Sequence, residues 1–162
     1  MEYMDFDNIK LGSWAIEPNL FLYIVENLQP GYKILELGSG SGTVFLSENY
    51  NVTSIEHNAD FVGLSKKSAY IHAPIIDDWY DVEKLKDLPE YDLLLIDGPS
   101  SREGDRIWLI QHLDLFNIKD QIIIIDDVNR QGEFDLMVAL GAILNRPFMI
   151  HKGEDKDFGV LR

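Results

Sequence analysis

The sequence contains no cysteine. This absence excludes a disulfide framework, a thiolate metal site and a cysteine nucleophile. Basic residues are also scarce, because 14 Lys and Arg stand against 28 Asp and Glu and give a net charge of −14. Such a charge repels a nucleic-acid backbone unless the basic residues gather on one face, and they are not clustered in the sequence. We therefore expect no nucleic-acid partner.

Long apolar runs are missing as well. None approaches the roughly 20 residues that a membrane-spanning helix needs, so no membrane partner is expected. The first ten residues, MEYMDFDNIK, are acidic and lack the basic, apolar and small-residue order of a signal peptide. These features favour a cytoplasmic location.

The apolar content suits one core. A chain of 162 residues that is 46% hydrophobic predicts a single domain over 1–162, with an N-terminal helical segment over 1–30 and a core over 31–162. The stretch EPNLFLYIVENLQPG is typical of a leading helix that is closed by Pro30 and Gly31.

Four β-branched apolar runs predict strands: YKILELG, NVTSIEH, YDLLLIDG and DQIIIIDD. The last two lack polar alternation, as expected where both faces of a parallel sheet are covered. The segments between the strands predict helices, over Thr43–Asn49, Asp60–Ser68, Val82–Asp87 and Arg102–Phe116. Strands that alternate with helices indicate a parallel α/β sheet.

The carboxyl end predicts a change of strand direction. An amphipathic helix, RQGEFDLMVALGAILNRP, precedes two strand-like pieces, FMIHKG and FGVLR, that are separated only by EDKD. So short a link requires an antiparallel pair, because parallel strands need a crossover of a dozen or more residues.

A glycine-rich bend, Glu36 to Gly42 (ELGSGSG), follows the first predicted strand. Glycine lets a ligand approach the backbone closely, so a nucleoside-type ligand is indicated. Thr43 stands where the dinucleotide fingerprint would place its third glycine, which argues against NAD. Glu56 ends the second strand, where a carboxylate accepts hydrogen bonds from ribose hydroxyls.

These residues resemble the class I S-adenosylmethionine-dependent methyltransferases, whose first motif is E/D-x-G-x-G-x-G and whose second motif is acidic, as in SIEH here. The resemblance implies an α/β, Rossmann-like three-layer sandwich with a mostly parallel seven-stranded sheet and an antiparallel last strand. It also implies that the glycine-rich loop lies against the methionine part of the cofactor S-adenosylmethionine and that Glu56 binds the ribose of this cofactor. The implied cofactor residues are Glu36, Gly38, Ser39, Gly40, Gly42, Thr43, Glu56 and His57.

The same family usually places an acid after the third strand, against the adenine. In YIHAPIIDDWYD the strand ends either at Ala73 or at Ile76, and we favour Asp77 or Asp78 for this contact, with Trp79 as an apolar wall. The alternative is that Trp79 packs against the next helix and the acids cap that helix.

Acidic residues close two further strands, Asp97 the fourth and Asp126-Asp127 the fifth. Adjacent parallel strand ends face one crevice, so we expect these three catalytic candidates to converge. A Mg²⁺ ion would relieve their repulsion. The layout resembles metal-dependent O-methyltransferases, although Ser100 stands where catechol-type enzymes carry a lysine. The alternative is that Asp126-Asp127 cap the following helix and that Asp97 is the acid that many metal-free methyltransferases carry at this place.

The loop DGPSSREGDR lies where members of the family contact substrate. Arg102 and Arg106 are four residues apart and are expected on one helix face, where they would bind an anionic substrate group. The alternative is that they pair with Glu103 and Asp105. Trp14 is expected either to close over the cofactor or simply to pack.

The leading hypothesis is methyl transfer to a small-molecule acceptor, at an oxygen atom. One alternative is a non-catalytic S-adenosylmethionine-binding protein or partner subunit, because the chain is short and lacks an inserted cap. A homodimer would supply such a lid. An NAD-dependent oxidoreductase is a more distant alternative, since no catalytic Tyr-Lys pair is evident.

Overall fold

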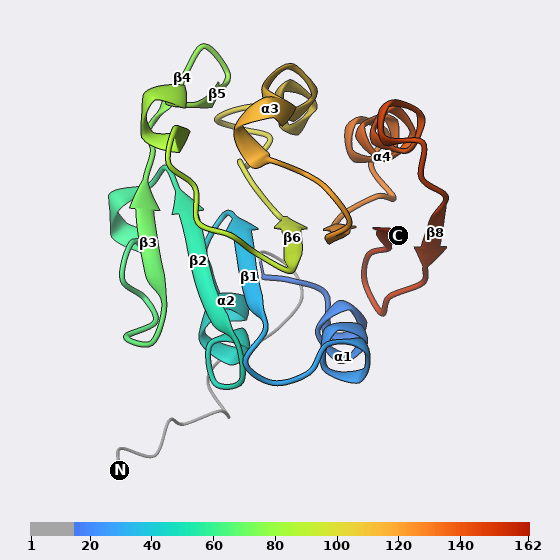
Figure 1. Ribbon diagram of the computed structural model, residues 1–162, viewed down its shortest axis with the longest axis horizontal. Helices are drawn as coiled ribbons and strands as arrows, with labels where there is room; N and C mark the ends of the chain where they lie inside the picture. The colour runs from blue at the N-terminus through green and yellow to red at the C-terminus, as the bar shows by residue number, and fades with distance from the viewer. Residues whose placement is uncertain (1–14) are drawn as a thin grey trace.

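The computed structural model describes residues 15–162, and Trp14 therefore lies outside the described residues. Seven strands form one sheet in the order β3-β2-β1-β6-β7-β9-β8 (Figure 1). Their bounds are β1 Lys33–Leu37, β2 Asn51–Glu56, β3 Ala69–His72, β6 Leu93–Ile96, β7 Ile122–Ile125, β8 Phe148–His151 and β9 Phe158–Leu161. The predicted α/β fold class is confirmed.

Strand direction in the seven-stranded sheet changes only at the last strand of the sequence, β9. The strands β3, β2, β1, β6 and β7 run parallel to their neighbours. In contrast, β9 inserts between β7 and β8 and is antiparallel to both. The short link over residues 152–157 requires β8 and β9 to be antiparallel to each other, as predicted.

Both faces of the sheet are buried because successive side chains of a strand point to opposite faces. In β6, Leu93 and Leu95 pack on one face with α1 (Pro18–Asn27) and α2 (Ser41–Leu46). On the other face, Leu94 and Ile96 pack with four elements: η3 Val82–Leu85, η4 Arg106–His112, α3 Leu113–Phe116 and α4 Gln131–Leu144. The result is the predicted three-layer sandwich.

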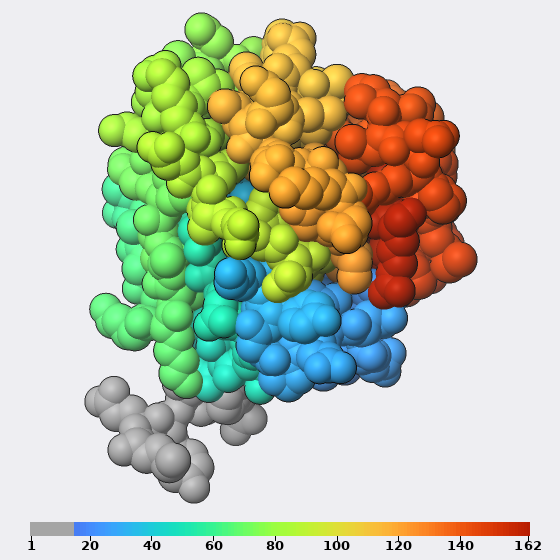
Figure 2. All heavy atoms as spheres, viewed as in Figure 1, coloured from blue at the N-terminus to red at the C-terminus, as the bar shows by residue number. Residues whose placement is uncertain are grey.

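The start of the described chain is joined to its carboxyl end. Glu17 is fully buried, and its Oε2 atom accepts hydrogen bonds from the backbone of Asn19 and Leu20 at the start of α1. Its Oε1 atom accepts a hydrogen bond from the backbone of Glu154 at 2.6 Å. Figure 2 shows the carboxyl-terminal residues (red) packed beside the amino-terminal ones (blue). One carboxylate thus caps a helix and holds the β8–β9 link.

Three predicted helices are shorter than expected. The segment over Asp60–Ser68 contains only the 3₁₀ turn η2 (Ala59–Phe61), because the chain becomes extended at Val62 and reaches a positive φ of 86° at Gly63. Val82–Asp87 forms only the 3₁₀-helix η3. The segment over Arg102–Phe116 begins at Arg106, where the Asp105 side chain caps the first turn, and becomes α-helical only at its end.

The third predicted strand ends at His72, and a separate hairpin follows it. Strands β4 (Ile75–Ile76) and β5 (Trp79–Tyr80) pair antiparallel around Asp77 and Asp78. Both turn residues have positive φ, 50° and 66°, as a two-residue type I′ turn requires. The acids therefore form a turn and do not cap the next helix, whose N-cap is Asp81.

The order of the strands creates a switch point between β1 and β6. From β1 the chain builds outward to β2 and β3, and it then returns to place β6 and β7 on the opposite side. Ligands of open α/β sheets bind outside the carboxyl ends of the strands at such a point.

Within residues 15–162, no helix has the length and apolar character needed to cross a bilayer.

Candidate functional site

A cavity of about 640 Å³ lies at the switch point, a size usual for small-molecule sites. Its walls come from the loop after β1, the end of β2 and the loop after β6. The lining residues that carry the argument are Gly38, Ser39, Gly40, Glu56, His57, Phe61, Asp97, Arg102, Asp127 and Lys156.

The loop after β1 is shaped by two glycines with different constraints. Gly38 has φ of +88°, and a Cβ there would lie 3.1 Å from the Cα of Gly98, so the two loops touch through bare backbone. At Gly40, in contrast, a Cβ would meet no atom of residues 15–162 within 4 Å. Because Gly40 lines the cavity, that space is available to a ligand.

Three predicted cofactor residues lie beneath the loop and are not part of the cavity wall. Glu36 is 1% exposed, and its Oε2 atom accepts hydrogen bonds from Thr43 Oγ1 at 2.7 Å and Ser54 Oγ at 2.6 Å. Thr43 Oγ1 in turn accepts from the backbone N–H of Gly40 at 3.1 Å. Gly42 is buried against Ile16. Among the described residues, Glu36, Gly42 and Thr43 therefore support the loop from below.

Burial raises the pKa of Glu36 from 4.5 to about 7, although its hydrogen bonds to Ser54 and Thr43 oppose the shift. Between these values the native carboxyl keeps its proton while the unfolded one has lost it, so stability falls as pH rises through this window. The neutral Glu36→Gln side chain does not titrate. As pH rises from 4.5 to 7, we therefore expect the unfolding free energy of Glu36→Gln to increase by about 2–3 kcal/mol relative to that of the wild type.

Urea unfolding at a series of pH values measures this difference. The control is Glu26→Gln, which changes an exposed carboxylate on α1 and is expected to follow the wild type. If the unfolding free energies of Glu36→Gln and the wild type changed in parallel across this pH window, the raised pKa of Glu36 would be contradicted.

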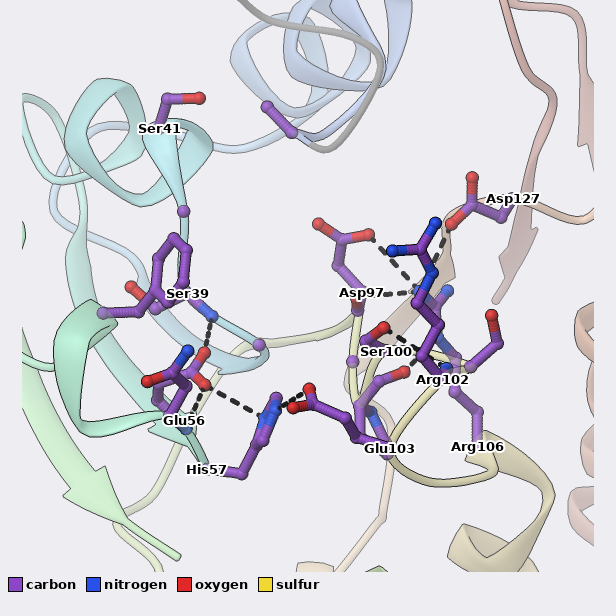
Figure 3. Close-up of a pocket in the computed structure, with 18 of the residues that line it drawn as sticks. Ser39, Ser41, Glu56, His57, Asp97, Ser100, Arg102, Glu103, Arg106 and Asp127 are labelled. Carbon is purple, nitrogen blue, oxygen red and sulfur yellow. Dashed lines mark hydrogen bonds and ion pairs between the residues drawn. The ribbon is translucent and has the colours of Figure 1, made fainter. Parts of the chain in front are cut away.

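The end of β2 brings a buried carboxylate to the cavity. Glu56 is 3% exposed, and it accepts hydrogen bonds from the backbone of Ser39 and of Asn58, each at 2.7 Å. His57 Nδ1 lies 3.0 Å from Glu56, and its Nε2 atom contacts Glu103 of the loop after β6. Figure 3 shows this chain of side chains along one edge of the cavity.

The aromatic side chain at the cavity is not the predicted one. Trp79 is 2% exposed and stacks on His112 at a centroid distance of 6.4 Å, so it packs against η4. Asp77 and Asp78 form the hairpin turn and, with Trp79, are not among the lining residues. Phe61, which is 43% exposed, lies on the wall instead. The expected adenine contacts are corrected accordingly.

The three acids from the strand ends converge, as predicted. Carboxylate oxygens of Asp97, Asp126 and Asp127 lie within 4.8 Å of one another. The side chains of Asp126 and Asp127 are 0% and 4% exposed, and that of Asp97 is 15% exposed on the cavity wall. Buried carboxylates this close repel one another unless positive charge lies beside them.

Arg106 provides part of that charge. Its side chain is 6% exposed, and its guanidinium lies 3.2 Å from Asp127 and 3.7 Å from both Asp97 and Glu133. It also donates to three backbone carbonyls, those of Pro99, Asp97 and Asp126. The expectation that Arg106 shares a helix face with Arg102 is wrong, because η4 begins only at Arg106. Arg106 lines the cavity, with its guanidinium directed at the acids. Arg102 lies in the preceding loop and lines the cavity.

Lys156 provides further positive charge beside the acids, and it was not identified from the sequence. Its Nζ atom lies 2.7 Å from Asp126 Oδ2 and 3.3 Å from Asp127 Oδ1. Burial, together with the neighbouring Asp126, raises the pKa of Asp97 well above its usual range, while Arg106 opposes the shift. The carboxylates raise the pKa of Lys156 against the effect of its own burial. Lys156 therefore stays protonated beside the acids.

The cluster as it stands does not fit a magnesium ion. A Mg²⁺ site needs oxygen ligands at about 2.0–2.1 Å from a common centre. Here the oxygens of Asp126 and Asp127 that would form it face the Lys156 ammonium. The neighbouring oxygen of Asp127 faces Arg106. Two side-chain cations thus take the role that was predicted for the metal.

The sequence matches no protein family and no curated protein. The structure resembles an S-adenosylmethionine-dependent methyltransferase from Aquifex aeolicus over 90% of this chain and 88% of that chain, with 12% identity and a TM-score of 0.61. It also resembles a tRNA methyltransferase from the same organism, over 96% and 72% of the two chains, with 15% identity and a TM-score of 0.62.

A third similar structure is a magnesium protoporphyrin IX methyltransferase from Synechocystis PCC 6803 with bound S-adenosylmethionine. The similarity covers 89% of this chain and 76% of the chain of that methyltransferase, with 15% identity and a TM-score of 0.56. Likeness at this level of identity concerns the arrangement of the chain. The fold is the Rossmann-like methyltransferase fold.

Proposed function

We propose that this protein binds S-adenosylmethionine in the cavity at the switch point and transfers its methyl group to an oxygen atom of a small-molecule acceptor. The observation that carries the proposal is the pairing of Glu56 with the Gly38–Ser41 loop. A buried carboxylate and a loop with open space at Gly40 line the same cavity, in a fold shared with S-adenosylmethionine-dependent methyltransferases.

The residues of the cavity fit this cofactor. The backbone groups of Ser39 and Asn58 fix the Glu56 carboxylate from two sides, and a carboxylate has about four lone-pair sites, so it can also accept from a ribose hydroxyl. Phe61 offers an apolar face for an adenine ring. The space above Gly40 accepts the part of the ligand that passes the loop.

The chemistry asks the protein mainly to align the reactants. When bound, S-adenosylmethionine supplies an already activated methyl group, so positioning and exclusion of water account for much of the catalysis. Asp97 lies on the cavity wall across from Ser39 and Glu56 (Figure 3). Its carboxyl group is placed to form a hydrogen bond with the acceptor oxygen, which supports oxygen as the methylated atom.

The charge of the protein supports a small-molecule acceptor. One similar structure is a tRNA methyltransferase, so the fold by itself does not select the acceptor. A net charge of −14 opposes a polyanion. Arg102, at the edge of the cavity, is suited to an acceptor that carries a single anionic group.

A second candidate is a non-catalytic S-adenosylmethionine-binding protein. It is favoured by one observation, namely that Arg106 and Lys156 already engage the acids that catalysis would use. Both candidates share the cofactor site, and they differ in whether a methylated product forms.

Isothermal titration with S-adenosylmethionine, S-adenosylhomocysteine and NAD tests the cofactor assignment. We expect dissociation constants in the micromolar range for the first two ligands and no binding of NAD. A screen of small hydroxyl and carboxyl compounds with a methyl-labelled cofactor then separates the two candidates. Binding of NAD alone, or of none of the three, would refute the proposed cofactor site.

A further inference from the structure

The predicted metal cluster contains two buried side-chain cations. We propose that the Lys156 ammonium holds the position of a divalent ion among Asp97, Asp126 and Asp127, and that the site works without metal. The proposal concerns a residue in the β8–β9 link, far in sequence from the acids that it serves.

Three oxygen atoms lie close to the Lys156 ammonium. Nζ lies 2.7 Å from Asp126 Oδ2 and 3.3 Å from Asp127 Oδ1, and it donates to the backbone carbonyl of Ala15 at 2.8 Å. Apart from ion pairs, the two aspartate oxygens have no hydrogen-bond partner among the described residues. The ammonium is the cation that pairs with Asp126 Oδ2, whereas Asp127 Oδ1 lies 3.3 Å from both Lys156 and Arg130.

The lysine is held rigidly in this position. Its side chain is 8% exposed, and the link that carries it is anchored by the hydrogen bond from Glu154 to the buried Glu17. The link also packs closely at Gly153, where a Cβ would lie 2.3 Å from the Glu17 carboxyl carbon. These contacts fix the link that carries the lysine, and the hydrogen bond to Ala15 joins the ammonium itself to the start of the described chain.

Arg106 closes the opposite side of the cluster. Its guanidinium contacts Asp127 Oδ2 at 3.2 Å and approaches Asp97 Oδ1 at 3.7 Å. A divalent ion placed between the aspartates would lie close to two fixed positive charges in a poorly solvated region, where like charges repel strongly. Metal binding therefore requires one of the two cations to be displaced.

The consequence for the acceptor rests on the proposed function. A bound divalent ion acidifies a substrate hydroxyl, and an ammonium does this far less well. A site with Lys156 in the metal position therefore favours an acceptor oxygen that is already ionised near neutral pH. Carboxylates and acidic phenols are such acceptors, whereas simple alcohols are not.

The test compares Mn²⁺ binding to the wild type and to Lys156→Met, by electron paramagnetic resonance of free Mn²⁺. Removing the ammonium leaves three converging carboxylates, so we expect Lys156→Met to bind Mn²⁺ at least about tenfold more tightly than the wild type. The matched control is Lys152→Met in the same link. Lys152 pairs with Asp157 but is 83% exposed, and its loss should leave Mn²⁺ binding at the wild-type level.

Equal Mn²⁺ affinity of the wild type and Lys156→Met would overturn the proposal, whether both bind the ion or neither does. A second measurement needs no variant, because a ligand of the native state raises its melting temperature. We expect the wild type to melt at the same temperature in millimolar Mg²⁺ and in EDTA, and a clear rise with Mg²⁺ would also overturn the proposal. Titration with S-adenosylmethionine is read separately, so failure of the cofactor site is distinguishable from failure of this inference.

Discussion

Gly40→Val is expected to weaken S-adenosylmethionine binding by at least about 100-fold, or about 2.7 kcal/mol, without loss of the fold. The reason is steric. Gly40 lines the cavity, and a Cβ there would meet no atom of the described residues within 4 Å, so a side chain fills space that a ligand needs. The backbone of Gly40 is extended, with φ of −168°, which any residue can adopt. Isothermal titration measures the affinity, and thermal melting measures the stability.

Two other glycines sharpen the comparison. Gly132→Val is the matched control, because a Cβ at Gly132 also meets no protein atom but lies on α4, away from the cavity wall. It should leave cofactor affinity unchanged. Gly38→Val, at a positive φ and against Gly98, should destabilise the protein itself. Wild-type affinity in a folded Gly40→Val variant would show that the loop is not the cofactor loop.

Arg106→Met should have the largest effect on stability, a loss of about 3–5 kcal/mol. Removing one partner of a buried ion pair leaves the others without compensation, and here Asp127, Asp97 and Glu133 all face the guanidinium. Three backbone carbonyls lose their donor as well. Because domains of this kind have a total stability of about 5–15 kcal/mol, the variant should unfold at a much lower urea concentration.

Arg102→Met, in the loop just before η4, is the matched control. Arg102 is exposed, and surface changes of this kind usually alter stability by no more than about 0.5 kcal/mol. Urea unfolding followed by circular dichroism compares the two variants with the wild type. If Arg106→Met loses no more stability than Arg102→Met, the buried arginine does not stabilise the cluster.

The sheet and the position of the cavity are predictable because their signals are local. Apolar runs such as DQIIIIDD specify covered parallel strands, and the short link after β8 requires an antiparallel partner. Glu56 and the three aspartates follow from the same rule, since each closes a parallel strand. Their meeting at one edge is a property of the sheet and needs no knowledge of other contacts.

The partners of these acids are not predictable in the same way. Lys156 lies in a polar link without periodicity, and its position depends on contacts with Ala15 and with the Glu17 carboxylate, far away in the sequence. Arg106 looks like a surface arginine until Asp105 is known to start the helix just before it. Phe61 was assigned to a helix, and the positive φ at Gly63 that ends this segment has no unambiguous local signal.

The insertion of β9 between β7 and β8 bears on biosynthesis. Each strand from β1 to β7 in the main sheet pairs with a neighbour that the ribosome has already made or is about to complete. Strand β8 cannot join the sheet until β9 is made, because among the described residues β8 pairs only with β9, and β9 is the strand that pairs with β7. Lys156 emerges in the interval between the two. A nascent chain therefore carries Asp126 and Asp127 without their ammonium until β9 docks, so the sheet and the acidic site are completed in the same step.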